Sequence, residues 1–428
     1  MMSSKKSLTE KHLKFEQQKA VDHLYGQDNS ILVAATGAGK TCITLTAIAE
    51  LQSKGVIGSV VIAAPAKVIE TGVWPGEASK WAHLCGLRII AVVGTPEQRA
   101  RLVVAPADIY VVSLNNLGSF LHLKHGCDGI VLDELSKASG KQARRLASSK
   151  YGSMFKWRVG LTATPVSQDF TKLFSMVKIL DGSLGRSKEK YMNEYFTCDY
   201  QGYNWTIREG SEQKILDKIA HLVHVVPDNK VGTLPPLFRK EIRFDMTPGA
   251  REAYDDMRRD MVALDIDKPN AAAASGALRQ IATGFLYDRV TDGVITLDTA
   301  RFDALLQWHA ALEGRPGLIF YEYVEQGRQI AAARLANTTA YQITSMSHGV
   351  DGLQDKFADA CMVQPNWSND VRLQSEGRLW RTGQKNPVNI TTLVCSDSLD
   401  DVVIDRVEGR EGWMERFLKH LGGEQDDV

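Results

Sequence analysis

Short apolar runs alternate with segments of helical periodicity along the first half of the chain. Such runs predict buried strands, and the apolar repeat between them predicts amphipathic helices. Strands that alternate with helices favour a parallel, doubly wound sheet, whose ligands bind at the carboxyl ends of the strands. We expect strands at residues 31–35, 58–64, 87–93, 108–112, 129–132 and 157–161, and helices at 14–25 and 42–51.

The second half of the chain shows a similar alternation after an intervening segment. Residues 167–225 have mainly helical periodicity, and we interpret them as a helical elaboration of the first domain. Residues 227–236 are rich in proline and glycine, which favours a linker, so we place two domains at 1–236 and 237–428. In the second domain we expect strands at 238–245, 316–320 and 361–363, and helices at 248–264, 271–283, 300–312, 324–335 and from about residue 370.

Composition narrows the class of protein without indicating a partner. The 428 residues include 51 basic and 51 acidic side chains, so a nucleic-acid surface must come from local clustering of charge. The six cysteines form no CxxC pair, which argues against a disulfide framework or zinc site and favours reduced thiols in the cytoplasm. No apolar run reaches about 18 residues, and the N-terminus lacks the apolar segment of a signal peptide, so we expect no membrane contact.

A phosphate-binding loop follows the first predicted strand. The glycines of such a loop let backbone N–H groups approach a triphosphate, and the N-terminus of the next helix adds partial positive charge. Lys40 would reach the β and γ phosphates, and the Thr41 hydroxyl would bind Mg²⁺. A plain glycine turn is the alternative, but strand, loop and helix occur in the order that a phosphate cradle requires. The loop and helix start comprise Thr36, Gly37, Ala38, Gly39, Lys40, Thr41 and Cys42.

Polar side chains follow two of the later predicted strands. Asp133 and Glu134 come directly after the strand at 129–132. Downstream of a phosphate cradle, Asp133 would hold Mg²⁺, directly or through water, and Glu134 would orient and polarise the attacking water. Thr162 and Thr164 follow the strand at 157–161, where two hydroxyls could link the γ-phosphate side of the site to a neighbouring surface.

Weaker candidates lie on the segments between these motifs. Gln17 or Gln18, on the helix before the cradle, could present an amide to an adenine edge. Lys67, which follows the second strand, could contact a phosphate backbone or could equally be a solvated lysine. Ser113 and Asn115 follow the strand at 108–112 and could contact a sugar–phosphate chain.

Two arginines near the C-terminus form a further candidate site. Arg378 and Arg381 are three residues apart, so on a helix they would share a face, and guanidinium groups match phosphate oxygens in bidentate fashion. An isolated pair of this kind would be exposed surface arginines. Gly377 beside Arg378 indicates a close approach, which favours a second lobe that donates arginine fingers to a nucleotide held by the first.

The order of these motifs resembles that of a known group of motor proteins. AATGAGKT, LDEL, LTATP and QSEGRLWRTGQ look like the successive motifs of superfamily 2 helicases. The RTGQ ending, the LDGSLG stretch and the LRQIATG stretch are similar to the Swi/Snf-like translocases, especially their compact bacteriophage forms. The resemblance covers about residues 13–394 and implies an α/β fold of two tandem RecA-like parallel-sheet lobes with helical insertions. It places ATP in the cleft between the lobes and DNA across both.

The resemblance also assigns roles at the nucleotide. It implies that Gln17 contacts adenine, and that Gln374, Arg378 and Arg381 close the site from the second lobe. ATP and Mg²⁺ are the cofactors that it implies. One departure concerns the segment from residue 320 to 348, which is short for the elements normally found there, so we expect a trimmed second lobe.

The DNA contacts that the resemblance implies lie on both lobes. Lys67, Ser113 and the loop at 347–353, which contains Gly349, would contact the DNA backbone or the nucleotide. Thr162 and Thr164 would couple hydrolysis to that contact. The glycine loop, residues 349–352, is one residue longer than the family spacing.

These observations together predict an ATP-hydrolysing motor that translocates on double-stranded DNA. Single-stranded DNA and RNA stay open as partners, and we expect a cytoplasmic monomer in a bacterial or phage-infected cell. One alternative is a strand-separating or annealing helicase, although no wedge hairpin is visible in the sequence. The other is a nucleotide-gated binding or inhibitor protein without enzymatic activity, for which an intact water-activating Glu134 would be unnecessary.

Overall fold

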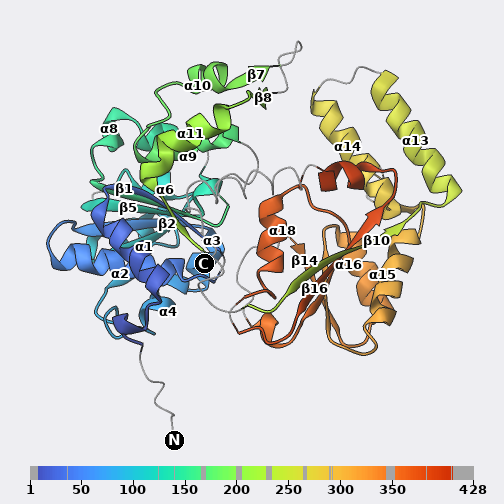
Figure 1. The fold of residues 1–428 in the computed structure, drawn as a ribbon, viewed down its shortest axis with the longest axis horizontal. Coiled ribbons are helices and arrows are strands. Elements are labelled where there is room, and N and C mark those ends of the chain that lie inside the picture. Colours follow the sequence, from blue (N-terminus) through green and yellow to red (C-terminus); the bar gives the residue numbers. More distant parts are fainter. Residues whose placement is uncertain are drawn as a thin grey trace, which may run out of the picture. The chain divides into compact units, whose positions relative to one another are not determined.

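The chain is described in a computed structural model, coloured along the sequence in Figure 1. The structure describes residues 8–407 except 36, 124, 139, 165–169, 199–204, 228–233, 264–267, 289–290, 292, 344–351, 382 and 406. These residues divide into two compact units, one within residues 8–227 and the other within 234–407. Among the described helices, none combines the length and the apolar character needed to cross a bilayer.

The N-terminal unit is built on a seven-stranded sheet with the strand order β3-β4-β2-β5-β6-β1-β9. Every neighbouring pair is parallel, as in β1 beside β6, where Leu32 pairs with Leu161. All six strands expected in this half are confirmed, with small shifts at their ends. The strands are β1 Asn29–Ala34, β2 Ser59–Ala64, β3 Ile89–Ala91, β4 Ile109–Ser113, β5 Cys127–Asp133, β6 Trp157–Thr162 and β9 Val223–Val226.

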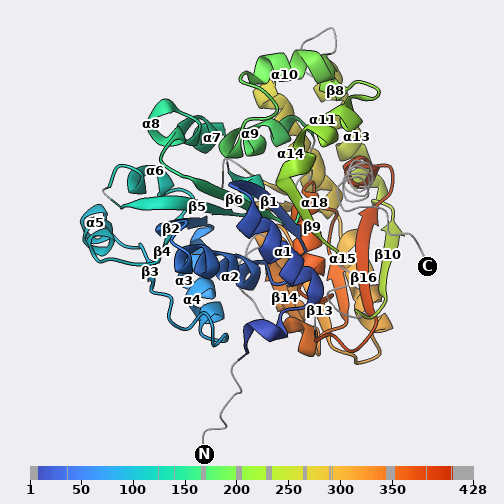
Figure 2. The ribbon, with the colours of Figure 1, turned by 60° about the vertical axis from the view of Figure 1, so that its left-hand side comes forward.

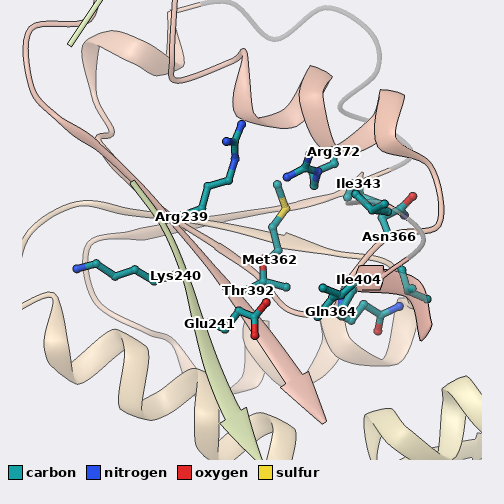
Figure 3. Close-up of a pocket in the computed structure, with 13 residues that line it drawn as sticks. Arg239, Lys240, Glu241, Ile343, Met362, Gln364, Asn366, Arg372, Thr392 and Ile404 are labelled. Carbon is teal, nitrogen blue, oxygen red and sulfur yellow. The ribbon is translucent and has the colours of Figure 1, made fainter. Parts of the chain in front are cut away.

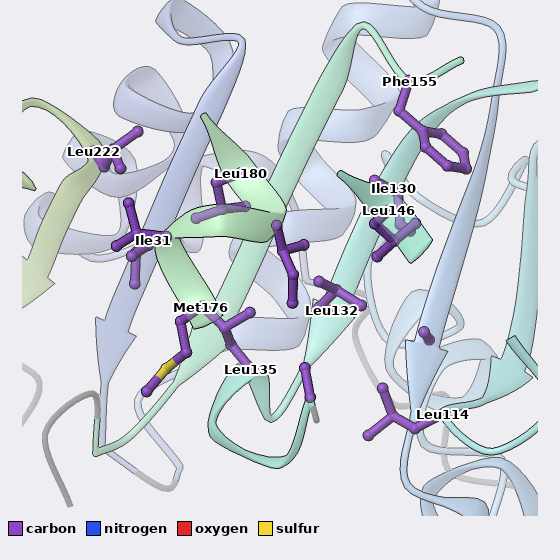
Figure 4. Packing of buried hydrophobic residues seen from close by; sticks show 14 of the residues in the cluster. Ile31, Leu114, Ile130, Leu132, Leu135, Leu146, Phe155, Met176, Leu180 and Leu222 are labelled. Carbon is purple, nitrogen blue, oxygen red and sulfur yellow. The ribbon is translucent and has the colours of Figure 1, made fainter. Parts of the chain in front are cut away.

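Helices cover both faces of this sheet (Figures 1 and 2). On one face, Leu32, Ile43 and Trp74 belong to a core that joins the sheet to α1, α2 and α4. On the other face, Ile31, Leu132 and Leu135 belong to a second core (Figure 4). The helices up to β6 are η1 Glu10–His12, α1 Phe15–Gly26, α2 Lys40–Ser53, α3 Ala66–Glu70, α4 Val73–Ala78, α5 Pro96–Val104, α6 Leu117–Phe120, η2 Leu135–Lys137, α7 Gly140–Leu146 and α8 Ser149–Gly152.

The segment expected to be mainly helical is more mixed than its periodicity indicates. It contains α9 Phe170–Leu180, α10 Lys188–Tyr195, α11 Ser211–Ile219 and η3 Ala220–Leu222. It also contains an antiparallel hairpin of β7 Phe196–Cys198 and β8 Trp205–Ile207. The segment is thus mainly helical as expected, but its end differs, because β9 pairs with β1 as an edge strand of the main sheet. A four-residue strand gives no alternation long enough to identify.

The C-terminal unit contains a five-stranded parallel sheet with the order β10-β16-β15-β13-β14. The expected fold class, an α/β protein with two parallel sheets and helical insertions, is thus confirmed. The strands are β10 Leu237–Phe244, β13 Gly317–Tyr321, β14 Thr338–Gln342, β15 Asp359–Met362 and β16 Val388–Cys395, with a small hairpin of β11 Phe285–Tyr287 and β12 Val294–Thr296. The helices are α13 Pro248–Ala263, α14 Lys268–Thr283, α15 Ala300–Ala311, α16 Val324–Ala333, η4 Leu353–Asp355 and α18 Asn369–Glu376.

A buried arginine ties the elements of the C-terminal unit together. The Arg301 guanidinium, 3% exposed, donates to Asp400 Oδ2 at 2.5 Å and to the carbonyl oxygens of Val363 and Leu393 at 2.8 and 3.0 Å. It also donates to the Ala282 carbonyl oxygen at the end of α14. A buried charge is stable only when it is paired and hydrogen-bonded, so we assign this arginine a structural role.

Candidate ATP-binding and hydrolysis site

The phosphate-binding loop joins the end of β1 to the start of α2. Gly37 and Gly39 have φ values of 88° and 93°, in the left-handed region that favours glycine. Gly39 is the residue that precedes α2, so the free N–H groups of the helix start at the loop. This strand–loop–helix geometry fits an anionic phosphate group. Thr36, the first residue of the expected loop, lies outside the described residues.

Gln17 on α1 packs directly against this loop. Its Nε2 donates to the Ala38 carbonyl oxygen at 3.0 Å, and its Oε1 accepts from the backbone N–H of Lys14 at 2.9 Å. A Cβ atom built on Gly39 would lie 2.5 Å from the Gln17 Nε2 atom. Gln18, the other candidate for an adenine contact, instead donates to Asp22 at 3.3 Å. The structure therefore brings Gln17, and not Gln18, to the loop, while its contact with adenine stays a prediction.

The Lys40 ammonium lies at the carboxyl end of β1. Its Nζ donates to the carbonyl oxygens of Ala34 and Ala35 at 2.6 and 3.2 Å. Thr41, next along α2, is partly buried, and Cys42 is fully buried, which raises the pKa of its thiol to about 12. Cys42 is therefore a packing residue with a neutral thiol at ordinary pH, whereas Lys40 is a cation at the mouth of the loop.

Asp133 ends β5 and has an unusual charge environment. Burial, together with the negative charge of Glu134, raises its pKa to about 6, while Lys40 and Lys137 oppose this rise. The indole N–H of Trp74 also favours the charged form of Asp133, although its geometry falls short of a hydrogen bond. An acidic pair that repels itself in this way is stabilised by a nearby cation. No local sequence pattern indicates that Trp74 on α4 lies near the Asp133 carboxylate, because the two residues are brought together only by the fold.

Glu134 has a backbone conformation that is rare for its residue type. Its φ and ψ are both 61°, in the left-handed region, where strain is typical of functional sites. The next residue, Leu135, is fully buried and packs on Gly160 of β6, where a Cβ atom would overlap the Leu135 Cδ2 atom. The close contact between Leu135 and Gly160, which has no side chain, thus fixes the turn that presents Glu134.

The donor set at this site fits a magnesium nucleotide. Mg²⁺ is held in proteins by one or two carboxylates together with hydroxyls, phosphates and water, and Thr41, Asp133 and Glu134 supply groups of this kind. Within the described part of the chain no group of three or more His, Cys, Asp or Glu side chains could hold a metal ion. A metal at the loop would therefore depend on phosphate oxygens as well as protein ligands.

Thr162 and Thr164 are buried at the end of β6, the strand beside β5. Thr162 is fully buried and its Oγ1 accepts from the backbone N–H of Thr164 at 3.1 Å. The two threonines thus form one local turn at the same sheet edge as Asp133. Their coupling role stays a prediction.

The two expected DNA-contact residues of the N-terminal unit differ in exposure. The Lys67 side chain on α3 is 48% exposed and pairs with Glu70 at 3.4 Å. Ser113 is only 9% exposed, and its Oγ accepts from the backbone N–H of Asn116 at 3.2 Å. Lys67 is therefore available to a phosphate group, whereas Ser113 mainly stabilises the turn before α6. Gly349, the third expected contact, lies outside the described residues.

In the C-terminal unit, a carboxylate anchors α18 to the sheet. Glu376, 3% exposed, accepts hydrogen bonds from Arg239 on β10 at 2.8, 3.2 and 3.3 Å and from Arg372 at 3.4 Å. Arg239 and Arg372 line a cavity of about 360 Å³ over the sheet (Figure 3). This bidentate pair holds the helix that carries Gln374.

The expectation that Arg378 and Arg381 share a helix face is wrong. The helix α18 ends at Glu376, and both arginines lie in the turns that follow Gly377. The turn is anchored by Leu379, which is fully buried, and by the Trp380 indole, which donates to the Pro235 carbonyl oxygen at 2.7 Å. The anchored turn, and not helical periodicity, therefore sets how the two guanidinium groups are presented.

Comparison with known proteins identifies the class to which this site belongs. The SNF2-related domain matches residues 16–287, more than half of the chain. The chain therefore belongs to the SNF2-related family and is an Snf2-family ATPase core. Its relatives in this family indicate ATP hydrolase activity with a nucleotide substrate.

Individual relatives come from a phage and from eukaryotes. Protein p41 of Acyrthosiphon pisum secondary endosymbiont phage 1 is 24% identical over 95% of this chain and 97% of that protein. The DNA repair and recombination protein RAD54-like of Drosophila mojavensis is 22% identical over 91% of this chain, and nuclear protein STH1/NPS1 of Saccharomyces cerevisiae is 22% identical over 88%. This chain spans 60% and 32% of the lengths of those two proteins.

Among solved structures, the chain is similar to the SWI2/SNF2 ATPase core of Sulfolobus solfataricus in complex with dsDNA. The TM-score is 0.44 at 17% sequence identity, over 96% of this chain and 93% of that chain. A second structure, of the Sulfolobus solfataricus SWI2/SNF2 ATPase core domain, has a TM-score of 0.44 at 14% identity, over 94% of this chain and 89% of that chain.

Proposed function

We propose that this chain is an ATP-driven motor that translocates along double-stranded DNA. The observation that carries the proposal is the gathering of Lys40, Asp133 and Glu134 at the carboxyl ends of β1 and β5, within a chain of the SNF2-related family. The phage relative p41 supports an additional proposal, that the protein acts in the cytoplasm of a phage-infected cell.

Each residue of the N-terminal site has a proposed task in hydrolysis. Backbone N–H groups of the loop and the Lys40 ammonium bind the β and γ phosphates. Thr41 and Asp133 hold Mg²⁺, which supplies charge neutralisation at the phosphate oxygens when bound. Glu134 orients and polarises the attacking water, and its strained backbone, fixed by Leu135, keeps the carboxylate in one position.

The C-terminal unit would complete the site in the ATP-bound state. Gln374, Arg378 and Arg381 meet the nucleotide when the two units close, and hydrolysis releases them. The DNA backbone would be contacted by Lys67, Ser113 and the loop with Gly349. Hydrolysis would be coupled to this contact by Thr162 and Thr164. Because such contacts are made to phosphate groups, sequence preference should be weak and salt dependence strong.

A triplex displacement assay tests translocation directly. A motor that walks on duplex DNA releases a third strand from a triplex in the presence of ATP and leaves the duplex intact. A Glu134→Gln variant, which keeps the shape of the side chain, should release no third strand. Absence of ATP-dependent release by the wild-type chain would contradict the proposal.

One observation favours strand separation as a second candidate function. The β7–β8 hairpin carries Trp205, which is 39% exposed, and an aromatic side chain on a hairpin can stack on an unpaired base. Unwinding of forked DNA by the wild-type chain, with loss of unwinding in Trp205→Ala, would support this function. Equal unwinding by both, or none by either, would remove the hairpin from the mechanism.

A further inference from the structure

A strongly basic groove lies on the N-terminal unit beyond the phosphate-binding loop. It encloses about 970 Å³ between η2, α7, α9 and the start of α10. Figure 2 shows α7 and α9 on the same side of the sheet, and the two helices pack against each other. Seven of its described lining residues are lysine or arginine and none is acidic. In a chain with 51 basic and 51 acidic residues, this is a local concentration of charge.

Four of the seven groove cations are exposed and take part in none of the ion pairs that the structure describes. They are Lys141, Arg144, Arg186 and Lys188. Arg144 donates only to the Gly140 carbonyl oxygen at 3.3 Å, on its own helix. Neutral carbonyl groups do not cancel a charge, so the groove keeps a positive potential that concentrates anions.

The remaining lining residues indicate what kind of anion fits. They are the hydroxyl residues Ser136 and Ser175, three small residues, and the largely buried side chains of Phe174 and Met176. Hydroxyl groups and long cationic side chains bind phosphate oxygens. None of the described lining residues is an amide or a carboxylate, the side chains that read adenine and cytosine. The groove therefore fits a run of regularly spaced phosphates.

We infer that this groove binds the sugar–phosphate backbone of a nucleic acid, in addition to the contacts proposed for Lys67 and Ser113. The groove and Lys67 lie on different layers: Ile69 of α3, the helix that carries Lys67, packs in the core of α1 and α2, whereas Leu146 of α7 packs in the core on the opposite face. The inference concerns binding alone, so it can hold even if the proposed translocation fails.

The position of the groove also gives binding a consequence for catalysis. The 3-10 helix η2 begins directly after Glu134, and Ser136 and Lys137 of η2 line the groove. A backbone in the groove therefore contacts the short segment that presents the catalytic acid. This part of the inference rests on the proposed function, and it predicts that occupancy of the groove raises ATP turnover.

Two double variants with equal charge change test the inference. Arg144→Glu with Lys188→Glu removes two groove cations. Arg145→Glu with Lys190→Glu changes the same residue types on the same two helices at exposed positions that do not line the groove. Binding to a short fluorescent DNA duplex is measured from about 50 to 200 mM salt. We expect the groove variant to bind at least about tenfold more weakly, with a salt slope smaller by about 2, and the control to stay within about twofold of wild type.

The same measurements define what would overturn the inference. Equal salt slopes for the two variants, with wild-type binding intact, would show that the groove does not contact nucleic acid. Stronger competition for the groove by polyglutamate or by phosphatidylserine vesicles than by DNA would assign it to an acidic protein or a membrane surface instead. ATP turnover without DNA reports on folding and should be the same in both variants. If the wild-type chain released no third strand, but the groove variant still bound DNA more weakly than the control variant, the proposed translocation would be rejected and the inference about the groove would stand.

Discussion

Leu135 packs on Gly160, and the contact is so close that a Cβ atom on Gly160 would overlap Cδ2 of Leu135 and lie 3.1 Å from its Cγ. The two residues connect the inner strand β6 to the turn that holds Glu134 in a left-handed conformation. The position of Glu134, for which we propose the task of activating water, therefore depends on a strand residue from another segment of the chain.

Gly160→Ala should reduce ATP turnover selectively. The added methyl group displaces Leu135 and with it Glu134, so we expect kcat to fall about tenfold or more while nucleotide affinity changes little, because the phosphate-binding loop is untouched. Overpacking should also cost about 1–3 kcal/mol of stability. Gly129→Ala is the matched control: its Cβ would meet Val60 Cγ2 at 2.9 Å in the same sheet, so it should lower stability without the selective loss of kcat. Equal kcat losses in both variants would contradict the positioning role.

Lys40→Ala should abolish nucleotide binding at micromolar concentrations. The Lys40 ammonium donates to the Ala34 and Ala35 carbonyl oxygens at the start of the loop, and removal of a charged phosphate contact costs about 2–4 kcal/mol. Titration with a fluorescent ATP analogue measures the effect. Lys54→Ala, at the far end of the same helix, should bind the analogue as the wild type does. Undiminished binding by Lys40→Ala would remove this lysine from the site.

Arg381→Ala and Arg378→Ala should each reduce turnover by about a hundredfold or more, in line with other arginine fingers. Because the proposed contact of these residues with the γ-phosphate forms only after ATP has bound, binding of ATP itself should change only a few-fold. Single-turnover hydrolysis separates the two quantities. Arg328→Ala, an exposed arginine paired with Glu325 on α16, provides the control. Turnover within a few-fold of wild type in Arg381→Ala would show that this arginine does not reach the nucleotide.

Stability should fall with acidification because of a histidine pair between α1 and β9. Burial and the neighbouring His23 lower the pKa of His224 from 6.5 to about 4, with smaller effects from Glu16 and Lys19. The ring centroids of His23 and His224 lie 5.1 Å apart. Between these pH values the unfolded chain therefore binds more protons than the folded chain. The contribution of His224 to the free energy of unfolding is fully present above pH 6.5 and is lost as pH falls toward 4.

The His224→Phe variant tests whether protonation of His224 causes the loss of stability at low pH. The variant keeps a ring against His23 but cannot take up a proton, so its stability should depend less on pH by about 1–3 kcal/mol over that interval. Urea unfolding at several pH values measures the difference. The same pH dependence in variant and wild type would show that other groups cause the loss.

The alternating pattern predicted most of the fold because long buried strands leave a clear signal. Every expected strand of the first half was confirmed, and so was the helix that begins at the phosphate-binding loop. The edge strands β9 and β14 were missed because they are short and only partly buried. The strand β16 was missed as well, although its eight residues are mostly buried. That part of the sequence was interpreted only through the QSEGRLWRTGQ motif that precedes the strand.

Side-chain relationships across the fold were less predictable than the motifs themselves. Gly160 and Leu135 belong to different segments, and no local pattern indicates that they touch. The basic groove was missed because its cations come from three segments whose individual charge is ordinary. The end of α18 at Glu376 was missed because the arginine spacing continues a helical repeat, whereas burial of Leu379 and the Trp380 bond to Pro235 favour a turn.

The measurement that tests the central claim most directly is ATP turnover with and without duplex DNA, with Glu134→Gln as the inactive reference. The account predicts a low basal rate that duplex DNA raises at least several-fold, that high salt suppresses, and that is absent from the variant. Turnover that duplex DNA leaves unchanged at low salt would contradict a DNA-driven motor.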